Sequence, residues 1–235
     1  MSYEKEYMCM AQLETNVEQS REKRSRWRPI AAWAGISGPM LFFVISMVDG
    51  FLHPNYSALS EPISNLGAKA PNAWIQNVNF FLSGLLLVIF AIGFFWQLRL
   101  ITKGWWVIIS TFFLLLTGSC LALASVFPTD IPGYPPVTFH GRIHDIIFLV
   151  VFGSLLFAVL LSGLYLRKIP GWYGYGWYSI IQAIVMVLLF VILAAVNVSD
   201  GGLMGLFQRI FVYVAFSWYV VIGIHLLVLE RVRSA

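Results

Sequence analysis

Six long apolar runs constrain the fold of this chain more than any other feature. They lie near residues 30–52, 75–98, 104–127, 143–166, 174–197 and 209–229. Each run is close to the ~20 residues that a helix needs to cross the hydrocarbon core of a bilayer. Backbone groups in lipid must be hydrogen-bonded within the segment, so we predict helices. A membrane β-barrel is excluded, because it would show short segments of alternating hydrophobicity.

The composition supports the same class. Hydrophobic residues make up 59% of the 235 residues and charged residues only 11%, whereas soluble domains carry about 25% charged residues. We therefore predict an all-α polytopic membrane protein, a bundle of six transmembrane helices over residues 29–235. Residues 1–28 form a polar tail, which we expect to be cytoplasmic and at most partly helical.

The distribution of lysine and arginine predicts the orientation in the membrane. Basic residues end the tail, follow the second and fourth runs, and follow the sixth run as Arg231 and Arg233. By the positive-inside rule, both termini of this multi-pass cell-membrane protein are expected in the cytoplasm. The net charge of +4 belongs to this bias. The sequence has no aromatic-interleaved basic groove and no Gly-rich phosphate loop, so we expect no nucleic-acid partner.

Two loops on the predicted outer side carry local signals. In residues 53–74, Leu59, Ile63 and Leu66 are three and four residues apart, which predicts a short amphipathic helix at the membrane interface that ends at Gly67. Residues 128–140 contain four prolines and a glycine, which favours a stiff, irregular lid. Thr138 is expected to cap the fourth helix.

Polar residues gather at the outer ends of the predicted helices. Polar groups are costly inside a membrane, so their positions are informative. Asp49 and His53 are spaced i, i+4 and should share a helix face. In a single bundle these groups would converge on one pocket at the outer leaflet. The predicted binding residues are Arg209, Arg142, His53, Asp49, Asn77, Asp145 and Gln208.

Two kinds of catalytic chemistry would suit the residues of this pocket. The spacing of His140 and His144 would place two imidazoles on one metal, whose bound water could attack a lipid ester or amide. Gly141 stands where zincin-type sites carry a glutamate, so no metal is assigned. Alternatively, Ser60 or Ser64 would act as a nucleophile with His144 and an aspartate. The catalytic candidates are therefore His144, Asp130 and Ser64.

Other interpretations of the same residues remain open. The polar groups could form an ion-paired layer that locks the helix ends together. The chain could also be a non-enzymatic accessory or immunity protein that packs against another membrane protein. We favour a pocket that binds a lipid headgroup or small amphiphile, in which Arg209 and Arg142 hold an anionic group. His144 and Asp130 would orient it, and the alternative is a lipid hydrolase that uses the same two residues. Membrane lipids are the expected partners, while the cofactor and the oligomeric state are left open.

Short motifs near these loops resemble a known family. They are Ile63–Gly67 (ISNLG), Pro71–Ala73, Asn77–Gly84, Phe127–Asp130 (FPTD), Thr138 with Gly141 and His144, Gly205–Arg209 (GLFQR), and Trp218. From about residue 30 onward the chain is similar to the bacterial and archaeal six-span proteins called domain of unknown function 998. The resemblance implies the six-helix fold and points to Ser64, Asp130, His144 and Arg209, but it implies no activity. His140 is not a family position, which counts against a two-histidine metal site.

Overall fold

The computed structural model describes residues 2–69, 71–131, 138–199 and 202–234, and its regular structure there is helical. All six α-helices are long and apolar enough to cross a membrane, which confirms the predicted fold class. The elements are α1 (Ser2–Leu52), the 3₁₀ helix η1 (Ile63–Gly67), α2 (Ala73–Ile101), α3 (Trp106–Leu123), α4 (Phe139–Leu166), α5 (Tyr173–Ser199) and α6 (Met204–Ser234).

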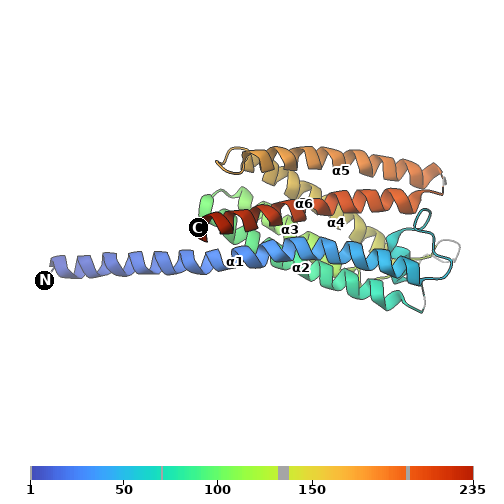
Figure 1. Cartoon of the computed structure of the whole chain (residues 1–235), viewed down its shortest axis with the longest axis horizontal. Coiled ribbons are helices and arrows are strands. Elements are labelled where there is room, and N and C mark those ends of the chain that lie inside the picture. Colours follow the sequence, from blue (N-terminus) through green and yellow to red (C-terminus); the bar gives the residue numbers. More distant parts are fainter. Residues whose placement is uncertain (1, 70, 132–137, 200–201, 235) are drawn as a thin grey trace.

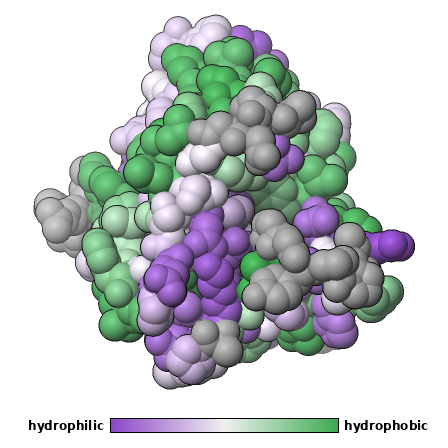
Figure 2. All heavy atoms as spheres, turned by 90° about the vertical axis from the view of Figure 1, so that its right-hand side faces the viewer, coloured by the Kyte–Doolittle hydropathy of each residue, from purple (hydrophilic) through white to green (hydrophobic). Residues whose placement is uncertain are grey.

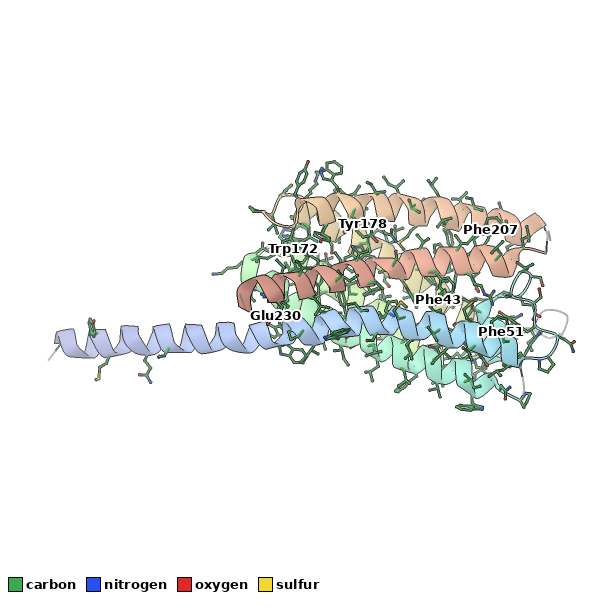
Figure 3. The ribbon with its side chains drawn as sticks, viewed as in Figure 1. Phe43, Phe51, Trp172, Tyr178, Phe207 and Glu230 are labelled. Carbon is green, nitrogen blue, oxygen red and sulfur yellow. The ribbon has the colours of Figure 1, made fainter. Side chains whose placement is uncertain are left out.

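The helices form a closed ring in sequence order. Each helix packs against the next one, and α6 returns to pack against α1 (Figure 1). The α1–α2, α3–α4 and α5–α6 connections lie at one end, here called the distal end, and the C-terminus lies at the other, the terminal end. Phe51 and Phe207 lie near the distal end in Figure 3, and Trp172 and Glu230 lie near the terminal end.

The N-terminal part of α1 projects beyond the bundle at the terminal end (Figure 1). The predicted boundary at residue 28 falls inside this helix, which continues without a break from Ser2, whereas the sequence predicted at most a partly helical tail. The apolar, membrane-spanning part begins at Trp27. Residues 2–28 contain no glycine or proline and many Glu, Gln, Arg, Lys and Met residues, whose helix propensity is high.

Two helix boundaries differ from those predicted from the apolar runs. α3 ends at Leu123, before the predicted residue 127, and α4 begins at Phe139 rather than at residue 143. The early start of α4 has a clear cause, since the Thr138 hydroxyl accepts a 3.0 Å hydrogen bond from the Gly141 N–H. The predicted cap at Thr138 is confirmed.

Aromatic rings fill the centre of the ring of helices. Phe90 and Phe94 of α2 stack with their centroids 5.3 Å apart. Trp218 of α6 packs edge-on against both rings, at 6.0 and 5.8 Å, a favourable geometry for aromatic pairs. The Trp218 indole N–H donates a 2.8 Å hydrogen bond to the Ser179 hydroxyl. One buried tryptophan therefore joins α2, α5 and α6.

At the terminal end, Arg28 ties three helices together. Its guanidinium donates to Gln97 of α2 at 2.8 Å and pairs with Glu230 of α6 at 3.2 Å. These contacts fix the ends of α1, α2 and α6 relative to one another, while large apolar side chains on the outer surface remain exposed for lipid contact, among them Ile108, Phe112 and Leu188.

α2 and α3 approach so closely that glycine is required at their contact. A Cβ atom on Gly84 would lie 2.6 Å from the Gly118 carbonyl oxygen and would also meet the backbone of Ala122. Backbone atoms cannot move aside as a flexible side chain can, so any larger residue must separate the two helices.

Gly84→Leu is therefore expected to lower the free energy of unfolding by about 1–3 kcal/mol, the usual cost of overpacking. The measurement is the melting temperature of the purified protein in detergent. Gly174→Leu is the matched control, because a Cβ there meets nothing within 4 Å. Equal melting temperatures for the two variants would contradict the close contact.

Candidate functional site

The distal end carries a hydrophilic area surrounded by apolar sides (Figure 2). The polar residues that line a cavity at this end come from the α1–α2 and α3–α4 connections, the starts of α4 and α6, and the end of α5. Most of the polar residues predicted to form one pocket do lie at this end, but they are divided among several separate sets of contacts.

Arg209 of α6 anchors the α1–α2 connection. Its side chain is buried, and Nη1 donates to the carbonyl oxygens of Ala58 at 2.7 Å, Glu61 at 3.0 Å and Gly205 at 2.9 Å. Nη2 donates to the Tyr56 hydroxyl, and the guanidinium lies 5.5 Å from the centre of the Tyr56 ring. Buried charges need such partners. Arg209 is thus bonded to the connection.

Further bonds hold this connection against the start of α6. The Leu206 N–H donates to the Leu59 carbonyl at 2.9 Å, and the Ile63 N–H donates to Gln208 Oε1 at 2.7 Å. A Cβ on Gly205 would lie 2.7 Å from the Ala58 carbonyl oxygen. The Gly-Leu-Phe-Gln-Arg motif is therefore a docking segment for the first distal connection.

The predicted interfacial helix is replaced by η1, which is packed inside the distal end. Ile63 and Leu66 are buried, while Leu59 is 56% exposed. Asn77 of α2 donates to the Gly67 carbonyl at 3.0 Å, and η1 ends at Gly67 as expected. Because Gln208 and Asn77 bond both ends of η1, the segment is drawn into the bundle instead of lying on lipid.

An ion pair between Glu61 and Lys69 closes the same connection. Asn65 and the Ser57 N–H also donate to the Glu61 carboxylate, at 3.2 and 3.3 Å. Burial alone would raise the pKa of Glu61, but these hydrogen bonds and Lys69 hold the pKa below its ordinary value. Glu61 is therefore ionised near neutral pH, and its charge is offset by Lys69.

Asp49 and His53 form a buried pair at the end of α1, as their spacing predicted. His53 Nδ1 lies 3.2 Å from Asp49 Oδ1, and Nε2 lies 3.1 Å from the Lys69 carbonyl oxygen. Further along α1 and α2, Asn79 donates to the Ser46 hydroxyl at 3.2 Å. These contacts join α1 to α2 and to the first connection.

Asp130 closes the α3–α4 connection. Its two carboxylate oxygens accept from the Thr138 N–H at 2.8 Å and the Thr138 hydroxyl at 2.7 Å. A Cβ on Gly141 would overlap this carboxylate, which explains the glycine. The Phe-Pro-Thr-Asp and Thr-x-x-Gly motifs thus form one capping unit. The remainder of the predicted lid, residues 132–137, lies outside the described residues.

His144 is buried one turn further along α4. Its Nδ1 lies 2.7 Å from the Phe127 carbonyl oxygen. A carbonyl can only accept, so Nδ1 carries a hydrogen, and Nε2 remains for another partner. Asp130 makes no hydrogen bond to His144. His140 is exposed next to the Phe127 ring, and the described part of the chain has no group of three His, Cys, Asp or Glu side chains that could hold a metal.

A polar cavity of about 450 Å³ lies between η1, α4, α5 and α6. Ser64, Gln208 and His144 line it, and within the described ranges Ser64 Oγ, Gln208 Nε2 and His144 Nε2 have no hydrogen-bond partner. Asp145 and Asn197 line its more exposed side. These polar groups are available to a bound molecule.

Two apolar cavities lie next to the polar one and share lining residues with it. The lateral cavity, about 360 Å³ between α4, α5 and α6, shares Leu149 and Phe190 with it. An inner cavity of about 50 Å³ extends toward the aromatic core and shares Ser64, His144 and Gln208. The polar cavity therefore has an apolar cavity next to it on two sides.

The structure thus separates the predicted site residues into two groups. Ser64, Asp130, His144, Asp145 and Gln208 line the polar cavity. The others lie elsewhere: Arg209, Asn77, Asp49 and His53 hold helices and loops together, and Arg142 is exposed and does not line the cavity.

Sequence reasoning missed several participants. Tyr56 carries no pattern that would have marked it. Asn65 and Phe127 belong to the ISNLG and FPTD motifs, but the motifs did not indicate that Asn65 bonds Glu61 or that the Phe127 carbonyl bonds His144. The buried bonding of Gln76, Asn79 and Ser83 could have been found, because these residues are spaced i, i+3 and i+7 on α2 and so share a helix face.

The fold and the cavity define a multi-pass membrane protein with a polar cavity at one end of a six-helix bundle. The chain belongs to the family described as "Protein of unknown function (DUF998)", whose model matches residues 36–225. The resemblance seen in the loop motifs is thereby confirmed. Neither the curated proteins nor the solved structures contain a match to the chain.

The role of Arg209 can be tested by Arg209→Gln. The shorter side chain leaves buried carbonyl groups without their donor, at about 1–3 kcal/mol for an unsatisfied buried group. We expect a lower melting temperature and faster hydrogen exchange in residues 53–69. Arg142→Gln removes an equal charge from an exposed position at the same end and should change neither. Equal exchange rates in both variants would rule out the anchoring role.

Proposed function

We propose that the protein binds an amphiphile whose polar head occupies the polar cavity and whose apolar chain occupies the lateral cavity. The observation that carries this proposal is that the two cavities adjoin at Leu149 and Phe190, which line both of them. One wall of this junction belongs to α4 and the other to α5. A molecule with a polar and an apolar part matches this division.

A path from the bilayer supports the proposal. Leu149, Val187 and Phe190 line the lateral cavity and are also 57%, 46% and 38% exposed on the outer surface. In a membrane this surface faces lipid chains. An amphiphile would therefore enter sideways between α4 and α5, with no need to pass its chain through water.

The head, rather than the chain, would decide which amphiphile binds. Lipid chains surround the protein, so moving a chain from the bilayer into the lateral cavity provides little hydrophobic free energy. The discriminating contacts are assigned to Ser64, Gln208 and His144, whose free polar atoms line the polar cavity. This assignment replaces the expected arginine contacts, because Arg209 is bonded to loop carbonyls and Arg142 does not line the cavity.

Hydrolysis of an ester-linked amphiphile is the second candidate function. It is favoured by one observation: Ser64 and His144 line both the polar and the inner cavity. Ser64 Oγ would attack the ester carbonyl carbon while His144 Nε2 takes its proton and passes it to the leaving alcohol. Water would then release the acyl group from Ser64. Asp130 has no part in this hydrolytic mechanism, since its carboxylate is bonded to Thr138, the cap of α4.

The binding proposal is tested by filling the lateral cavity. A Cβ on Gly153 meets nothing within 4 Å, and Gly153 lines this cavity. Gly153→Phe should therefore fold and place its ring where the chain would lie. With dodecanol as the probe, we expect occupancy of the purified protein, counted by native mass spectrometry, to fall at least about tenfold, a difference of 1.4 kcal/mol.

Gly174→Phe is the control for this experiment, because Gly174 is equally open but lies outside both cavities. It should bind dodecanol like the wild type. Undiminished binding by a folded Gly153→Phe protein would overturn the proposed place of the chain.

The proposal of ester hydrolysis is tested by a separate experiment. An alkyl fluorophosphonate should label Ser64 covalently in the wild-type protein, and the label should be absent from Ser64→Ala. Peptide mass spectrometry locates the label. Unlabelled Ser64 in a protein that binds dodecanol would exclude this chemistry and leave the binding proposal intact.

A further inference from the structure

The charges that line the polar cavity are negative. Asp130 and Asp145 contribute carboxylates, and the described lining residues include no lysine or arginine. Asp145 forms no hydrogen bond or ion pair with any described residue. Each Asp130 oxygen accepts one hydrogen bond from Thr138 and keeps capacity for another.

The adjoining space does not offset this charge. A second cavity of about 510 Å³ shares Pro62, Asn65, Asn197 and Met204 with the polar cavity. Its charged side chains are Glu61 and Lys69, which form an ion pair with each other. Among the lining residues the formal charge is therefore that of the two aspartates. Arg209 follows Gln208 but lines neither cavity, and its guanidinium is bonded to the Ala58 and Glu61 carbonyls.

Two buried side chains indicate that this region accommodates a ligand and is more than an acidic surface. His144 and Gln208 are 8% and 7% exposed, and both line the polar cavity. Gln208 Oε1 is bonded to the Ile63 N–H, so its amide nitrogen is the free group. With its hydrogen on Nδ1, a neutral His144 presents an Nε2 lone pair. Neither free atom is sealed from solvent, so both are accessible from the cavity.

We infer that the amphiphile bound under the proposed function carries a cationic ammonium head. An ammonium group has three donors and no acceptor, which suits two carboxylates and an imidazole lone pair. The Gln208 amide nitrogen is itself a donor, so it would bond water or another polar atom of the head and not the ammonium group. An anionic head would instead meet carboxylates of like charge, and such an arrangement disfavours a partner. The inference rests on the proposed function and specifies the class of its ligand.

The test compares three probes with the same twelve-carbon chain: dodecylamine, dodecanol and dodecyl phosphate. The full-length protein is held in phosphatidylcholine nanodiscs at pH 7, where the amine is protonated and the phosphate is anionic. Bound probe is counted by native mass spectrometry. We expect the amine to bind about tenfold better than the phosphate, with dodecanol between them. The preference should weaken with added salt, because part of the cavity is open to solvent.

Substitutions at Asp145 identify the source of the preference. Asp145→Asn should reduce the ratio of amine to phosphate binding about threefold, as expected for a partly exposed charge pair. Asp145→Glu keeps the charge and should keep most of the ratio. Glu230→Gln makes the same chemical change as Asp145→Asn, but at the terminal end, and should leave the ratio unchanged.

The possible outcomes distinguish failure of this inference from failure of the proposed function. Equal or stronger binding of dodecyl phosphate, or an unchanged ratio in Asp145→Asn, would overturn the cationic head. If binding of the probes were still lost in Gly153→Phe, the proposed amphiphile site would remain supported. Failure of all three probes to bind would overturn both proposals.

Discussion

The distal end depends on one buried guanidinium. Arg209 donates to three carbonyl groups and to a tyrosine hydroxyl, and these bonds hold the first connection against α6. η1 lies within this connection, shortly after the anchored Ala58 and Glu61 carbonyls, so the anchored loop also carries Ser64 to the wall of the polar cavity. A buried cation bonded to carbonyl oxygens avoids the cost of an unsatisfied charge. The site is therefore shaped by a residue that does not line it.

Most polar side chains at this end serve the architecture, and this determines which ones remain for function. Asp130 caps α4, Asn77 holds η1, and Asp49 pairs with His53. Hydrogen bonds inside a membrane protein replace those that water would otherwise make. Against that background the free atoms of Ser64, Gln208 and His144 stand out, because they share one cavity and lack partners among the described residues.

The sequence predicted the features whose causes are local. Six spans followed from run length, and the Thr138 cap and the Asp49–His53 contact followed from short spacings. The anchoring role of Arg209 could not be predicted, because it depends on the Ala58 and Glu61 carbonyls, 151 and 148 residues away, and any residue type supplies a carbonyl. Likewise, the division of polar residues between structure and cavity depends on how α4, α5 and α6 meet, which hydropathy does not specify.

The unbroken course of α1 has a mechanical consequence. The segment before Trp27 is about 38 Å long at 1.5 Å per residue, and it continues the same helix that crosses the bundle. For a straight helix of that length, tilting the buried portion by roughly 10° moves the far tip by about 7 Å. Small displacements of α1 against its neighbours are thus magnified at the amino terminus.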